Sequence, residues 1–142
     1  MLIETNIRTL LLAQSSITAL VPAQTVGGVS YQSVFNENPA QGVRPPFILI
    51  SHIDRDGMLN LGVTHGTAKT NIDIDCYANT FVAADAIGEA VKAFIQDYRG
   101  AAGSGTIDAV ELQDIRYDAI YEDQGRDVRE HIVSLNIDIF HR

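Results

Sequence analysis

Two stretches of the sequence alternate strictly between apolar and polar residues, and this pattern constrains the fold more than any other feature. The apolar positions are Ile72, Ile74 and Cys76 in the first stretch and Val133, Leu135, Ile137 and Ile139 in the second. Successive side chains of a β-strand point to opposite faces, so each stretch predicts a strand with one buried and one polar face. Such strands are typical of an antiparallel sheet with one covered face.

Two other segments have the three- and four-residue spacing of apolar residues that predicts an amphipathic helix. The first begins at Ile3 and its apolar face stops before Gln14. The second is expected to begin at the N-cap Thr80, to continue to Tyr98 and to end at Gly100. The glycine-rich residues 100–105 that follow are expected to form a flexible connector.

The remaining segments complete an α+β fold. We expect a strand at Val26–Phe35, entered through a Gly-Gly pair, and then a proline-containing surface loop at Asn36–Pro46. A strand opening at Phe47 should turn at Arg55-Asp56-Gly57 into a long arm, and the chain should close with a hairpin after residue 105. The expected fold class is α+β, an antiparallel sheet with helices packed on one face and a long protruding hairpin, and residues 1–142 form a single domain.

Charge and composition exclude several classes of protein. Ten Lys and Arg residues face 18 Asp and Glu residues, and the net charge is −8. A basic patch that binds nucleic acid is therefore not expected, and an acidic surface also repels anionic lipid. The apolar runs are too short to span a bilayer, no signal peptide is evident at the N-terminus, and the single cysteine excludes a disulfide framework. The expected cellular compartment of the protein is therefore a cytosol.

Two short motifs place a pair of polar side chains on one face of a strand, namely His52-x-Asp54 and Asp73-x-Asp75. Paired carboxylates can bind a hard cation or carry out acid–base chemistry. Any acidic amphipathic strand produces the same pattern, however. We therefore interpret both motifs as the solvated face of a half-buried sheet.

The other residues capable of chemistry also have structural interpretations. The histidines, which lack the spacing of a zinc-binding helix and are interpreted as surface residues, are His52, His65, His131 and His141. Cys76 alternates in phase with buried isoleucines, and burial and the neighbouring Asp75 would both disfavour its thiolate, so we expect a core residue. The glycines after position 99 follow a helix, whereas a phosphate-binding loop precedes one. No catalytic residue, cofactor or metal site is expected.

The order of segments resembles a known family more than any single motif does. A leucine-rich opening helix leads into a series of segments, which are Ser16–Val21, a strand with Tyr31, a proline-containing loop, Pro46–Ile50, Ile72–Ala78, a helix closing with Tyr98–Gly100, and Ser134–Phe140. In this order the chain resembles the tail-completion proteins of long-tailed phages, also called tail terminators or head–tail joining proteins. The resemblance extends over nearly the whole chain.

The resemblance implies a structural virion protein without catalysis or cofactor. It implies a homo-oligomer, commonly a hexameric ring, that caps the tail tube, stops its polymerisation and presents a surface to the head connector proteins. DNA would pass through the ring without specific binding. The expected location is the virion tail, and the host cytoplasm during assembly.

Two groups of residues fit that role. The polar strand face with Asp73, Asp75 and Asp138 is a candidate channel lining, because an acidic wall lets the phosphate backbone slide. The arm around Met58, Leu59, Leu61 and Val63 is a candidate assembly contact, because exposed apolar residues are a liability in a monomer. An alternative stays open, in which the chain is a small α+β enzyme or ligand-binding module with a pocket between the sheet and the proline-rich loop.

Overall fold

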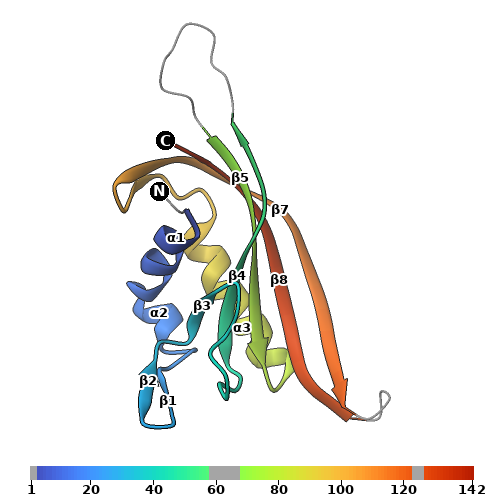
Figure 1. Ribbon diagram of the computed structural model, residues 1–142. Helices are drawn as coiled ribbons and strands as arrows, with labels where there is room; N and C mark the ends of the chain where they lie inside the picture. Colours follow the sequence, from blue (N-terminus) through green and yellow to red (C-terminus); the bar gives the residue numbers. More distant parts are fainter. Residues whose placement is uncertain (1–2, 58–67, 123–126) are drawn as a thin grey trace, which may run out of the picture.

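The computed structural model describes residues 3–57, 68–122 and 127–142. The helices are α1 (Ile3–Leu12), α2 (Ser15–Thr18) and α3 (Phe81–Ile95). The strands are β1 (Gln24–Val26), β2 (Val29–Tyr31), β3 (Val34–Asn36), β4 (Phe47–Gly57), β5 (Ala68–Ala78), β6 (Gly100–Ala102), β7 (Gly105–Glu122) and β8 (Asp127–His141). This mixture of helices and twisted strands confirms the α+β class (Figure 1).

A six-stranded sheet with the order β3-β4-β5-β8-β7-β6 is the centre of the fold, and β1 and β2 form a separate two-stranded sheet. The neighbouring strands of the large sheet are antiparallel except for β3 and β4, which are parallel. The expectation of an antiparallel sheet was therefore wrong at this edge. The parallel pair forms because the proline-containing loop, residues 37–46, carries the chain back to the start of β4 beside β3.

The loop that contains β1 and β2 also differs from the expected single strand. Gly27 and Gly28 have positive φ values of 59° and 81° and form the turn of a β1–β2 hairpin. Two successive residues with positive φ are typical of the two-residue turn that matches strand twist, and glycine adopts them without strain. The pair therefore separates two strands, and β3 begins only at Val34.

The turn expected at Arg55-Asp56-Gly57 does not occur there. Strand β4 continues through all three residues, which pair with Thr70, Lys69 and Ala68 of β5. An Asp-Gly pair can form a turn, but the ladder to β5 holds this one extended. The arm residues Met58, Leu59, Leu61 and Val63 lie outside the described residues.

Helix α3 begins as the sequence predicts and ends earlier. The Thr80 hydroxyl accepts a hydrogen bond from the Ala83 backbone N–H at 3.2 Å, which confirms the N-cap. The helix ends at Ile95, because Gln96 is extended and Asp97 has a φ of 62°. The expected end at Tyr98 and Gly100 was therefore wrong.

The segment after α3 is ordered as a strand. Gly100–Ala102 forms β6 and pairs with Gly105–Ile107 of β7. The Tyr98 hydroxyl donates to the Ala101 carbonyl oxygen at 2.8 Å. The flexible connector expected at residues 100–105 is thus a short hairpin at the edge of the sheet.

The core lies where α3 crosses β5 and β8. The alternating apolar residues of both strands are buried, and Ala84, Ile87, Val91 and Ile95 of α3 are buried with them. Gly88 allows the helix to approach closely, because a Cβ at this position would lie 2.8 Å from Val133 Cγ1. No helix in the described ranges is long and apolar enough to cross a membrane.

Candidate functional site

The polar residues of β5 and β8 form rows across the sheet on the face opposite the buried isoleucines. Asn71 lies opposite Asp138, Asp73 opposite Asn136, and Asp75 opposite Ser134. Side chains directly or diagonally opposite on neighbouring strands are close enough to interact. The expected channel-lining residues Asp73, Asp75 and Asp138 therefore share one face with amide and hydroxyl side chains.

Two asparagines connect two of these carboxylates. Asn71 and Asn136 donate to each other, Nδ2 to Oδ1, at 2.9 Å in both directions. Asn71 Nδ2 also donates to Asp138 Oδ1 at 2.7 Å, and Asn136 Nδ2 donates to Asp73 Oδ1 at 2.7 Å. Each carboxylate is thus fixed by a short hydrogen bond from an amide.

A cation lies at each end of this arrangement. Lys69 Nζ is 3.3 Å from Asp138 Oδ2, and Arg116 Nη2 of β7 is 3.0 Å from Asp73 Oδ2. We call the six residues the carboxylate–amide ladder, and they are Lys69, Asn71, Asp73, Arg116, Asn136 and Asp138. Two positive and two negative side chains balance within it.

The ladder corrects the interpretation of this face as simply solvated. Asp138 is only 6% exposed, and Asp73 is half-buried. Burial of a carboxylate requires compensating hydrogen bonds and charge, and the asparagines, Lys69 and Arg116 supply both. The predicted alternation of the strands was correct. The carboxylates and amides of the ladder, however, bind to one another and to two cations across the face.

Asp75 differs from the other two carboxylates because no described cation lies within ion-pair distance of it. Burial is the largest influence on its carboxyl group and raises the pKa. The Ser134 side chain, which hydrogen-bonds to the carboxylate, opposes this rise, and the charge of Asp73 adds to it. The charge of Arg116 also lowers the pKa, but the net direction of the shift is upward.

A shallow cavity of about 460 Å³ lies over this end of the polar face. Its lining includes Asp75, Tyr77, Arg116, Asp118 and Ser134. Acidic, cationic, aromatic and hydroxyl groups are mixed here. Within the described residues, no group of three or more His, Cys, Asp or Glu side chains has the geometry to bind a metal ion.

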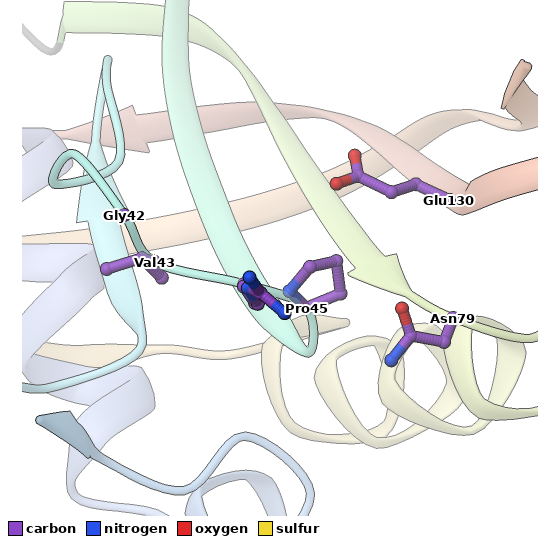
Figure 2. A pocket seen from close by; sticks show the side chains of 6 residues that line it. Gly42, Val43, Pro45, Asn79 and Glu130 are labelled. Atoms are coloured by element: carbon purple, nitrogen blue, oxygen red, sulfur yellow. The ribbon is translucent and has the colours of Figure 1, made fainter. Parts of the chain in front are cut away.

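A second cavity lies between the proline-containing loop and the sheet, where the ligand-binding alternative expects one. It has a volume of about 470 Å³ and is lined by Gly42, Val43, Arg44, Pro45, Asn79 and Glu130. Figure 2 shows the Asn79 amide and the Glu130 carboxylate across from Gly42 and Val43. The polar groups of its lining come from three separate segments of the chain.

The two histidines whose side chains are described differ in environment. His141 is only 3% exposed, and its Nε2 lies 2.8 Å from the Thr70 hydroxyl, so its interpretation as a surface residue was wrong. His131 is half-buried and contacts the Phe81 ring edge-on, with 6.4 Å between the ring centroids. The side chains of His52, Asp54 and His65 lie outside the described set.

Cys76 is fully buried in the core, as the alternation predicts. Burial raises the pKa of its thiol far above the ordinary value, and the charge of Asp75 raises it further. A thiol with so high a pKa stays protonated and is a poor nucleophile.

Sequence reasoning found the carboxylates of the ladder and missed their partners. Asn71 and Asn136 are at polar positions of the alternating strands, so their face was predictable, but their pairing depends on the register between β5 and β8. Arg116 reaches the ladder from β7, one strand further along the sheet order. Acidic and amide residues alternating in both strands were the signal that could have indicated such a network.

The sequence matches the model of a known protein family, and this match places the chain among phage tail structural proteins. It belongs to the family described as tail completion protein gp17, which it matches over residues 5–142. This membership confirms the resemblance found in the order of segments.

A solved structure has the same fold. The chain is similar to one in a structure described as the virion of a native gene transfer agent (GTA) particle, with a TM-score of 0.69 and 14% sequence identity. The similarity covers 97% of this chain and 92% of that chain. A comparison with curated proteins finds no match.

Proposed function

We propose that this chain forms a ring, hexameric as in the resemblance, that caps the tail tube and joins it to the head connector. The observation that carries the proposal is membership of the tail completion family over residues 5–142. The fold, shared over 97% of the chain with a component of a virion particle, supports assembly with other virion proteins. The role is structural, without catalysis.

We further propose that the polar face with Asp73, Asp75 and Asp138 lines the channel. The carboxylate–amide ladder balances its own charges, since two carboxylates face Lys69 and Arg116. DNA binding gains free energy when protein cations neutralise phosphates and release their counterions. A lining without surplus cations provides no such gain, so the DNA backbone passes without being bound. Asp75 adds one negative charge per subunit to this wall.

The arm residues Met58, Leu59, Leu61 and Val63 remain proposed contacts between the subunit and its neighbours in the tail. Deletion of residues 58–67 is expected to leave the fold intact and to abolish tail completion. Circular dichroism of the purified variant checks the fold, and electron microscopy of tails checks completion. A deletion variant that unfolds, or that yields tails of normal length with heads attached, contradicts this role.

The ring itself is tested with the full chain. Native mass spectrometry and light scattering, with and without purified tail tubes, should find a closed oligomer free in solution or bound at tube ends. Phage that lack the protein should accumulate tails without heads and tubes of irregular length. A chain that is monomeric under all conditions and absent from virions would overturn the proposal.

The alternative function has one supporting observation, the 470 Å³ cavity beside the proline-containing loop. A small-molecule screen by thermal shift, with the Glu130→Gln and Asn79→Ala variants as controls, tests it. Stabilisation of the wild type that both variants lose, without any ring, favours the ligand-binding module. Absence of any hit beside a ring in solution favours the structural role.

A further inference from the structure

The large sheet has an unpaired edge along most of its longest strand. Strand β7 spans Gly105–Glu122, and β6 pairs only with Gly105–Ile107. In the described strand order, no strand covers the outer side of β7 beyond that point. Unpaired N–H and C=O groups along an edge are a template for another strand.

Part of this edge is regular enough to accept a strand. Register shifts occur between Ile107 and Ala109, between Leu112 and Asp114, and between Ile120 and Tyr121. Such shifts bend a strand and interrupt pairing. Between the last two shifts, the segment Asp114–Ile120 pairs with β8 without interruption, so it presents an outer edge without a bulge.

The backbone groups that face outward from this segment can be identified. The Ala119 N–H donates to its neighbour's carboxylate, Asp118 Oδ1, at 2.7 Å. This N–H is therefore directed away from β8. Neighbouring residues of a strand direct their backbone groups to alternate sides, so Ile115 and Tyr117 also face outward.

Exposed aromatic side chains lie beside the same edge. Tyr117 is 55% exposed and Phe81 is 47% exposed, with 5.4 Å between their ring centroids. Tyr117 is paired with Val133, which faces α3, so both rings lie on the helix side of β7. A strand added here would cover apolar surface on one face and meet the charged Asp114 and Arg116 on the other.

The same sheet has a second unpaired edge at its other end. Strand β4 spans Phe47–Gly57, but β3 pairs only with Ile48–Ile50. A register shift lies between His52 and Asp54, and beyond it the segment Asp54–Gly57 pairs regularly with β5 and has no partner strand on its outer side among the described residues. Two different edges of one chain that pair with each other form a head-to-tail contact, which closes into a ring when the rotation allows.

We infer that the Asp114–Ile120 segment of one subunit pairs with the β4 edge beyond the register shift, Asp54–Gly57, of a second copy. This inference rests on the proposed ring and names the surfaces that would close it. The sheet would then continue from subunit to subunit, with main-chain hydrogen bonds providing association, and Phe81 and Tyr117 becoming buried.

Proline at an outward-facing position separates this contact from the fold. Ala119→Pro removes an N–H that β8 does not use, so the subunit should stay folded. Association between subunits should weaken by about tenfold or more, since a pairing hydrogen bond is lost and the proline ring obstructs the approach. Ala119→Ser keeps the N–H and should assemble like the wild type.

Light scattering over a concentration series measures association, and thermal unfolding verifies that each variant is folded. Hydrogen exchange offers a second measurement that needs no substitution. The amides of Ile115 and Tyr117 should exchange quickly in the dissociated subunit and slowly in the ring. Amides that remain fast in the ring overturn the inference even if Ala119→Pro does not fold.

A photo-crosslinking residue in place of Tyr117 identifies the partner. A cross-link to residues 54–57 of a second copy supports the inference. Rings that form equally well with a folded Ala119→Pro, or cross-links only to a tail-tube protein, overturn it and leave the ring intact. If the wild type forms no ring at all, the proposed function fails first, and the two failures are thus distinguishable.

Discussion

The two faces of β5 and β8 come from the same alternating residues and are held together in different ways. On one face, Ile72, Ile74 and Cys76 pack beneath α3 and need only to exclude water. On the other face, Asp73 and Asp138 are fixed by short hydrogen bonds from two asparagines and by two cations, Lys69 of β5 and Arg116 of β7. The apolar face tolerates changes of similar volume, whereas each member of the polar face depends on a particular partner.

The largest effect is expected from a change of charge in the ladder. Asp138→Lys would place a second cation beside Lys69 at a position that is 6% exposed, and Asn71 would lose an acceptor. We expect a loss of about 3–5 kcal/mol in the free energy of unfolding, measured by urea denaturation. The exposed Glu89→Lys on α3 makes the same change of charge and is the control, which should change stability by less than about 0.5 kcal/mol. Equal effects of both changes would mean that the ladder is solvated.

On the apolar face, Cys76→Ser tests whether the core accepts a polar atom. A buried hydroxyl without a partner should destabilise the protein by about 1–3 kcal/mol. The native thiol should also resist labelling by a maleimide until the protein unfolds, because it is buried and protonated. Rapid labelling of the folded wild type would contradict this burial.

Gly88→Ala probes the distance between α3 and the sheet. Alanine usually stabilises a helix by about 1 kcal/mol relative to glycine. Here the added Cβ would lie 2.8 Å from Val133 Cγ1, and the resulting overpacking should exceed that gain, for a net loss of about 1 kcal/mol. In the Val133→Ala background the substitution should become favourable. A stabilising effect in the wild-type background would show that the helix can move away.

The smallest effect should come from Asp75→Asn, and it should depend on pH. The folded-state pKa of Asp75 is raised by burial above its ordinary value of 3.8, so the folded protein binds this proton more tightly than the unfolded chain. Stability is therefore lost as the pH rises from about that value through the raised pKa. The asparagine variant should be more stable than the wild type at pH 7, and the difference should vanish toward pH 3. A difference that is constant with pH would contradict this origin.

The sequence predicted the elements whose pattern is local. The alternation in β5 and β8, the Thr80 cap and the burial of Cys76 depend on neighbours within a few residues, and all were found. The parallel β3–β4 pair and the strand β6 were missed because they depend on where distant segments meet. The Asp56-Gly57 pair predicted a turn, but pairing with β5 keeps both residues in an extended strand.

The candidate site was predictable only in part, for the same reason. Asp73, Asp75 and Asp138 could be assigned to one face from periodicity alone. Their burial could not, since it depends on the register that places Asn71 opposite Asp138 and on Arg116 from a third strand. A polar residue in an amphipathic strand indicates the direction of its side chain, but not whether water or another side chain is its neighbour.

The position of β8 between β5 and β7 has a consequence for how the molecule is made. The described strand order contains two groups, β3-β4-β5 and β7-β6, that are joined through β8. Both groups precede β8 in the sequence, so each group exposes an unpaired inner edge until β8 enters the sheet. We therefore expect the chain to be most prone to aggregation in the interval before β8 inserts, because unpaired strand edges are exposed during that time.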